Sequence, residues 1–75
     1  MKEKIKILLE DLLPLVDLES DFLFSELDSL GVTTILMTLS DEFGIKLEYK
    51  DATPKNLKNL DNIVAMVEHK LSEKE

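Results

Sequence analysis

The spacing of apolar positions predicts three main helices, because large hydrophobic side chains recur every three or four residues in three stretches. Residues 2–13 predict the first helix, residues 29–43 the second and residues 60–72 the last. Pro14 is expected to end the first helix, since proline lacks an N–H and disfavours the helical conformation of the preceding residue. Gly44 is typical of the left-handed residue that follows a helix. The pattern therefore indicates an all-α fold.

The stretches between these helices predict two connections of different kinds. Residues 17–27 follow no clear period and predict a long loop between the first and second helices. Thr53 and Pro54 are typical of a helix start, so a short additional helix is predicted over residues 55–58. Four side chains of the first loop are expected to pack on the core: Phe22, Leu23, Phe24 and Leu27. We therefore expect a single domain over residues 1–75, an antiparallel bundle of three to four helices.

Each main helix has one apolar face, which we expect to form the core. In the first helix these residues are Ile5, Leu8, Leu9, Leu12 and Leu13, with Leu15 and Val16 near the same stripe. In the second helix they are Val32, Ile35, Leu36, Leu39 and Phe43, and in the last helix Leu60, Ile63, Val64, Val67 and Leu71. Leu30 and Met37 lie on nearly the opposite side of the second helix. Flexible side chains such as methionine and leucine can pack against more than one partner protein. This exposed pair therefore indicates a docking surface.

The charge is strongly acidic, with 16 acidic against 9 basic residues and a net charge of −7. Nucleic acid binding needs a cationic surface, so this class of partner is excluded. An acidic surface instead favours protein partners with basic patches. No apolar run approaches the ~20 residues of a membrane span, and the first segment does not have the pattern of a signal peptide. We therefore expect a soluble, cytoplasmic monomer.

The residues available for chemistry do not predict an enzyme. The chain has no cysteine, so it forms no disulfide, thiolate metal site or thiol nucleophile. His69 is the only histidine, so the sequence does not predict a metal site. It does not predict a hydrolytic pair of His69 with Ser29 either. An EF-hand loop starting at Asp17 is also excluded, because its sixth position holds Phe22 where glycine is needed. No catalytic residue and no metal ligand are predicted.

The stretch Leu27-Asp28-Ser29-Leu30-Gly31 stands where the second helix begins. A serine in the first turn exposes its hydroxyl beside free backbone N–H groups and the positive end of the helix dipole. That environment suits a phosphate ester. The alternative is that Asp28 or Ser29 only caps the helix, since both residue types are good caps. The short motif by itself does not decide between the two.

Together with Asp41-Glu42-Phe43-Gly44-Ile45, this stretch resembles the acyl carrier protein family. In that family an Asp-Ser-Leu triplet opens the second helix and an acid-acid-Phe-x-Ile run closes it. The resemblance implies that a phosphopantetheinyl transferase moves 4′-phosphopantetheine from coenzyme A onto Ser29, with Asp28 helping to engage the transferase. The terminal thiol then carries an acyl group as a thioester between biosynthetic enzymes. A chain without cysteine fits this role, because the thiol comes with the cofactor.

The resemblance also implies where partners and cargo bind. The partners are the transferase, an acyl- or aminoacyl-loading ligase, and acyl-transferring or condensing enzymes that dock through basic patches. The implied docking residues are Glu26, Leu30, Thr33, Met37 and Asp41. The implied acyl pocket lies between the second helix and the short helix after it, against Leu39, Leu57 and Ile63.

Two departures from the family pattern bear on the pathway. Fatty-acid-synthesis members usually have an acid two residues after the serine and a Val-Glu pair further along, where this chain has Gly31 and Thr33-Thr34. Fewer acids weaken steering toward the basic patches of the usual partners. We therefore expect a specialised carrier in a fatty acid, polyketide or related pathway rather than a housekeeping one. Two alternatives stay open: an aminoacyl or peptidyl carrier of the D-alanyl or peptide-synthesis type, and an unmodified acidic interaction module in which Ser29 is only a helix cap.

Overall fold

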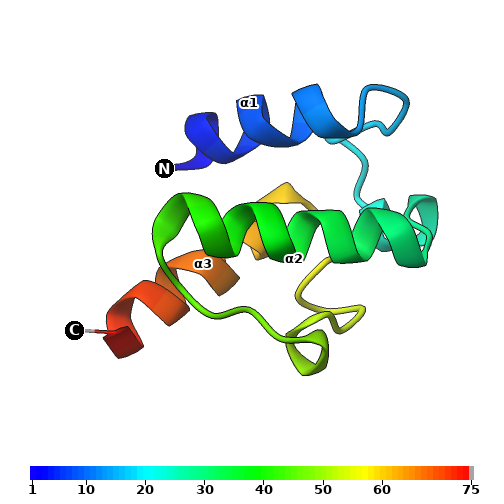
Figure 1. The fold of residues 1–75 in the computed structure, drawn as a ribbon. Helices are drawn as coiled ribbons and strands as arrows, with labels where there is room; N and C mark the ends of the chain where they lie inside the picture. The colour runs from blue at the N-terminus through cyan, green and yellow to red at the C-terminus, as the bar shows by residue number, and fades with distance from the viewer. Residues whose placement is uncertain (75) are drawn as a thin grey trace.

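The computed structural model describes residues 1–74, which form a bundle of three α-helices. α1 spans Lys2–Leu12, α2 spans Ser29–Phe43 and α3 spans Leu60–Lys74, and each packs against the other two. In Figure 1, α1 and α2 run in opposite directions, and α3 lies obliquely to both. No strand occurs within these 74 residues. The predicted all-α fold and its three main helices are confirmed.

The helix ends follow the signals in the sequence. The N–H of Leu13 donates to the Leu9 carbonyl at 2.8 Å, and Pro14 then stops α1. Gly44 follows α2 in the left-handed conformation, with φ 62°. Asn59 caps the start of α3, because its Oδ1 accepts the Asn62 N–H at 2.8 Å. At the end of α1, the end of α2 and the start of α3, backbone groups without a helical partner therefore find hydrogen-bond partners nearby in the sequence.

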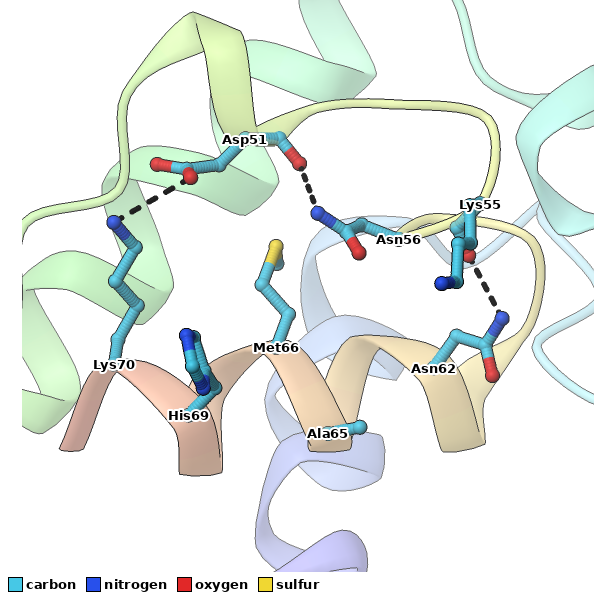
Figure 2. Close-up of a pocket in the computed structure, with 8 residues that line it drawn as sticks. All are labelled: Asp51, Lys55, Asn56, Asn62, Ala65, Met66, His69 and Lys70. Atoms are coloured by element: carbon cyan, nitrogen blue, oxygen red, sulfur yellow. Dashed lines mark hydrogen bonds and ion pairs between the residues drawn. The ribbon is translucent and has the colours of Figure 1, made fainter. Parts of the chain in front are cut away.

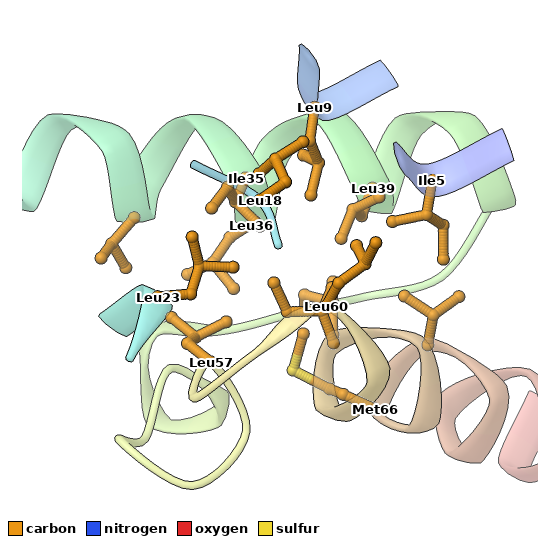
Figure 3. Close-up of a cluster of buried hydrophobic side chains, with 14 residues drawn as sticks. Ile5, Leu9, Leu18, Leu23, Ile35, Leu36, Leu39, Leu57, Leu60 and Met66 are labelled. Atoms are coloured by element: carbon orange, nitrogen blue, oxygen red, sulfur yellow. The ribbon is translucent and has the colours of Figure 1, made fainter. Parts of the chain in front are cut away.

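The core is a single hydrophobic cluster to which all three helices contribute (Figure 3). Its buried residues are Ile5, Leu9, Leu18, Leu23, Val32, Ile35, Leu36, Leu39, Leu47, Leu57, Leu60, Ile63, Met66 and Val67. The predicted core face of α2 is confirmed, since Val32, Ile35, Leu36 and Leu39 are buried and Phe43 packs against them. Leu18, Leu47 and Met66 were not predicted.

Three residues expected on the core are exposed instead. Leu12 ends α1 with 41% of its surface exposed, and Leu15 is 98% exposed in the turn that follows Pro14. Phe22 is 72% exposed, although its neighbour Leu23 is fully buried. Leu23 opens the 3₁₀ helix η1 (Leu23–Glu26), and its N–H donates to the Lys58 carbonyl at 2.7 Å. Adjacent side chains in such tight turns point in different directions, so fixing Leu23 inward leaves Phe22 in solvent.

The helix predicted over residues 55–58 is wrong, because this segment is only a turn. Thr53 does cap it, since its Oγ1 accepts the Asn56 N–H at 3.0 Å. Side-chain bonds to the backbone then replace a helical ladder: Asn56 donates to the Asp51 carbonyl at 2.9 Å, and Asn62 to the Lys55 carbonyl at 2.7 Å. The only further helical segment here is η2 (Tyr49–Asp51), a short 3₁₀ helix.

An ion pair between α1 and the first connection gives stability a testable pH dependence. Lys6 Nζ lies 2.9 Å from Glu19 Oε1, and this hydrogen bond lowers the pKa of Glu19. A pKa lowered by folding contributes stability above the unfolded pKa, about 4.3 for Glu, which is lost as the pH falls through the folded pKa. We expect the stability advantage of the wild type over Glu19→Gln to be small, because the pair is exposed, and to disappear in acid. Urea unfolding from pH 6 to pH 3 measures this, and a constant difference would contradict it.

Candidate functional site

Asp28, and not Ser29, caps the start of α2. Its carboxylate Oδ1 accepts the Gly31 N–H at 2.7 Å, and its backbone carbonyl accepts the Val32 N–H at 2.9 Å. The backbone of Asp28 is extended, with φ −100° and ψ −179°, as expected of an N-cap residue. Ser29 is therefore the first residue inside the helix. Of the two capping alternatives left open by the sequence, the structure selects Asp28.

The Ser29 hydroxyl is left free by this arrangement. Ser29 is exposed, and its hydroxyl makes no hydrogen bond with any residue from 1 to 74. The N–H groups of Ser29 and Leu30 also have no acceptor in this part of the chain, because Asp28 takes up only those of the next two residues. Two free N–H groups and the positive end of α2 surround an unengaged hydroxyl. These residues fit a phosphate ester on Ser29.

Gly31 is the residue whose role the sequence did not reveal. It is buried, and a Cβ built at this position would lie 3.3 Å from the Asp28 Oδ1 atom. The same Cβ would lie 3.6 Å from Leu27 Cδ2 and 3.9 Å from Leu13 Cδ2. A side chain here would press on the capping carboxylate, whereas its contacts with the two leucines would be ordinary van der Waals contacts. Gly31 thus leaves room for the Asp28 carboxylate over the first turn of α2.

We expect Asp28→Ala to lower the free energy of unfolding by about 1 kcal/mol, because alanine cannot accept the Gly31 N–H. Asp28→Asn should retain most of the stability, since asparagine also caps well. Urea denaturation of the two variants beside the wild type measures both effects. Equal losses in the two variants would show that charge, and not the cap, stabilises this turn.

The predicted docking residues on α2 lie along one exposed side of the helix. Leu30 is 73% exposed and Met37 is 63% exposed, with the exposed Thr33 between them and Asp41 one turn beyond Met37. The expected exposure of the apolar pair is therefore confirmed, while its role in docking stays a prediction. Glu26 is exposed as well, but its Oε1 accepts the Asp17 N–H at 3.2 Å and so holds the first connection.

The predicted pocket residues Leu39, Leu57 and Ile63 are all fully buried in the core cluster between α2 and α3. A cavity of about 290 Å³ lies instead between residues 51–56 and α3, with Met66 at its centre (Figure 2). Its lining residues are Asp51, Lys55, Asn56, Asn62, Ala65, Met66, His69 and Lys70. The pocket residues are brought together, but as packed core rather than as an open site.

His69 is not placed to activate Ser29. Its Nε2 lies 3.3 Å from Glu73 Oε2 on the same helix. The C-terminal half of α3, which carries His69, lies at the end of the molecule opposite the start of α2 (Figure 1). Within residues 1–74, no three His, Cys, Asp or Glu side chains are grouped so that they could hold a metal ion. No described helix has both the length and the apolar character that crossing a membrane requires.

A family model described as a phosphopantetheine attachment site matches residues 3–69, most of the chain. The chain belongs to this family. No curated protein and no solved structure matches it. As a member of the phosphopantetheine attachment site family, it is a carrier domain whose covalent cofactor is 4′-phosphopantetheine. Such a carrier works with transferases and biosynthetic enzymes, and the matched segment includes the whole of α2 with its free serine.

Proposed function

We propose that Ser29 carries the 4′-phosphopantetheine arm, and that the protein delivers acyl intermediates between enzymes of a specialised fatty acid, polyketide or related pathway. The observation that carries this proposal is the Ser29 hydroxyl, exposed and unbonded in the first turn of α2 because Asp28 serves as the cap. When attached, the arm supplies a thiol that holds the cargo as a thioester. The lack of cysteine in the chain agrees with a thiol that comes from the cofactor.

The residues at the start of α2 have different roles in the attachment reaction. The Ser29 oxygen forms a bond to the phosphorus that carries the pantetheine half of coenzyme A. The hydroxyl proton leaves to a base, and the bond to the nucleotide half breaks. Asp28 has one carboxylate oxygen engaged with Gly31, so its other oxygen is available to a cation of the transferase. The free N–H groups of Ser29 and Leu30 stabilise the attached phosphate.

Partners and cargo use different sides of α2 in this proposal. Leu30, Thr33, Met37 and Asp41 form the exposed side that meets loading ligases and condensing enzymes, with Glu26 at its edge. The acyl chain lies against Leu39, Leu57 and Ile63 on the buried side. Because these three side chains are fully buried, α2 and residues 53–58 must move apart before a chain can enter.

Two alternatives make different demands on the same residues. An aminoacyl or peptidyl carrier would use Ser29 in the same way and differ only in its cargo and in the enzyme that loads it. An unmodified acidic interaction module would need no cofactor and would use Ser29 only as a cap. The hydrogen bond from Gly31 to Asp28 disfavours the second alternative, since the cap is already provided.

Met37→Glu tests the docking side without disturbing the core. We expect cooperative unfolding with a midpoint close to that of the wild type, because Met37 is 63% exposed. We also expect transfer of cargo to a condensing enzyme to slow by about tenfold or more, since an apolar contact is replaced by a charge. Single-turnover assays with the loaded carrier measure this rate. Loss of cooperative unfolding would instead place Met37 among the residues that support the fold.

The proposal is tested by intact-protein mass spectrometry before and after incubation with coenzyme A, magnesium and a broad-specificity phosphopantetheinyl transferase. We expect a gain of one 4′-phosphopantetheine, which peptide fragmentation then assigns to Ser29. A gain assigned to another residue would overturn the role of Ser29. No gain by folded protein would make the interaction module the better explanation.

A further inference from the structure

The cavity between residues 51–56 and α3 has an apolar floor and a polar rim. Met66 forms the floor; it is 6% exposed and belongs to the core cluster. Figure 2 shows Lys55 and Asn62 on one side of Met66, and His69 and Lys70 on the other. The volume of about 290 Å³ lies near the lower end of the range for small-molecule sites, about 300–1,000 Å³. The cavity therefore has the size and lining of a site for a small ligand.

The walls of the cavity are held together by polar contacts. Asp51 is central, because its carbonyl accepts the Asn56 side-chain N–H at 2.9 Å and its Oδ1 lies 3.4 Å from Lys70 Nζ. The Asn62 side chain donates to the Lys55 carbonyl at 2.7 Å. These contacts join the segment before α3 to α3 itself. The shape is thus set before a ligand binds, which lowers the entropy cost of binding.

The charged groups of the cavity have one positive charge in excess. Lys70 is shared between Asp51, at 3.4 Å, and Glu73, at 3.8 Å. Lys55 is exposed, and its ammonium group forms no ion pair with any residue from 1 to 74. The net charge of −7 lies in residues 1–45, because residues 46–75 hold equal numbers of lysines and acids. An anion at the cavity therefore meets an unpaired cation.

We propose that this cavity binds one carboxylate group carried on a short aliphatic chain, with the Lys55 ammonium group as its main partner. A single negative charge matches the single positive charge in excess. A phosphate dianion is disfavoured, because the Asp51 carboxylate in the wall repels a second negative charge. The apolar surfaces of Ala65 and Met66 pack against the aliphatic part of the ligand.

Two sources could supply such a carboxylate. One is a free short-chain acid. The other is the far end of a cargo that carries a second acid group opposite its thioester. The cavity adjoins the proposed acyl pocket, because Leu57 follows Asn56 in the chain and Ile63 lies one turn before Met66 on α3. Binding to the cavity does not depend on attachment at Ser29, whereas the second source rests on that proposed function.

Butyrate is the probe for the unmodified protein, labelled with ¹³C in its methionine methyl groups. Met66 reports on the floor of the cavity, while Met1 and Met37, 47% and 63% exposed elsewhere, serve as internal controls. At constant ionic strength we expect a saturable shift of the Met66 signal alone, with a Kd of about 1–10 mM. Butyramide has nearly the same shape without the charge, so it should bind much more weakly.

Lys55→Gln removes the proposed charge contact, and Lys58→Gln is the matched control. Lys58 is also exposed and forms no ion pair within the described residues, but it does not line the cavity. We expect the Kd for butyrate to rise about tenfold in Lys55→Gln and to stay unchanged in Lys58→Gln. Both variants should unfold at the midpoint of the wild type. Equal Kd values in the two variants, equal affinity for butyramide, or no saturable Met66 shift would each overturn the inference.

Loaded carriers then identify the source of the carboxylate. Dicarboxylic cargoes of increasing chain length are attached through the arm, beside monocarboxylic cargoes of the same lengths. A dicarboxylic cargo that shifts the Met66 signal and prevents its response to butyrate would show that the cavity holds the end of the cargo. Unchanged titration of every loaded carrier would assign the cavity to a free acid. A protein that gains no arm would overturn the proposed function and leave the result with free butyrate intact.

Discussion

Replacing Ser29 by alanine is expected to abolish the gain of 4′-phosphopantetheine completely. The hydroxyl oxygen is the atom that bonds to the phosphorus, and alanine offers none. The fold should be unaffected, because Ser29 is exposed and its hydroxyl makes no hydrogen bond within residues 1–74. We expect the free energy of unfolding to change by less than about 0.5 kcal/mol. Intact mass after incubation with coenzyme A and the transferase measures the gain of 4′-phosphopantetheine. Urea denaturation measures the free energy of unfolding.

Ser25→Ala is the matched control for this experiment. Ser25 is also exposed and lies four residues earlier in η1, where its hydroxyl donates to the Phe22 carbonyl at 2.7 Å. We expect Ser25→Ala to gain the arm at the rate of the wild type. An arm gained by Ser29→Ala would move the attachment site elsewhere and contradict the proposed function. If neither variant gained the arm, the transferase would depend on the structure of this region as a whole rather than on one hydroxyl.

Leu39→Ala is expected to have the largest effect on stability. Leu39 is fully buried in the C-terminal half of α2, within the cluster that joins α2 to α3. Truncating a buried leucine costs about 3–5 kcal/mol, through lost burial and the cavity that remains. Small domains have about 5–15 kcal/mol in total, and one of this size lies near the lower end. We therefore expect a partly unfolded variant at room temperature.

Met37→Ala is the matched control on the same helix, two residues away. Its side chain is 63% exposed, so its truncation should cost well under about 1 kcal/mol. Circular dichroism at 222 nm is the suitable signal, because the chain has no tryptophan and its one tyrosine is exposed. Equal losses in the two variants would contradict the assignment of opposite faces of α2 to core and solvent.

The sequence predicted α2 well because several independent signals agree there. Apolar spacing, the two capping residue types at Asp28 and Ser29 and a glycine at Gly44 all indicate the same boundaries, and the structure has them. A helix was predicted over residues 55–58 because Thr53 and Pro54 are typical of a helix start, and Thr53 does cap the segment. The segment is nevertheless only a turn. The side chains of Asn56 and Asn62 then bond to backbone carbonyls, which the spacing of apolar residues does not reveal.

The first connection was the least predictable part of the chain. Its apolar residues have no period, so neighbours such as Phe22 and Leu23 could not be assigned to opposite environments. The contact that separates them is a hydrogen bond to Lys58, which is distant in the sequence. At the functional site the free serine was anticipated, whereas the choice of Asp28 as cap and the packing over Gly31 needed coordinates.

The hydrogen bond between the Leu23 N–H and the Lys58 carbonyl also links the opening motions of the two long connections of the molecule. It joins the segment before α2 to the segment before α3, so neither can open fully while it persists. A contact between residues so far apart in sequence is expected to form late in folding. The Leu23 amide should then exchange with solvent deuterium in the same opening event as the amides of residues 53–58. The motion that uncovers the core for a cargo would thus be one concerted opening, visible as a shared exchange rate.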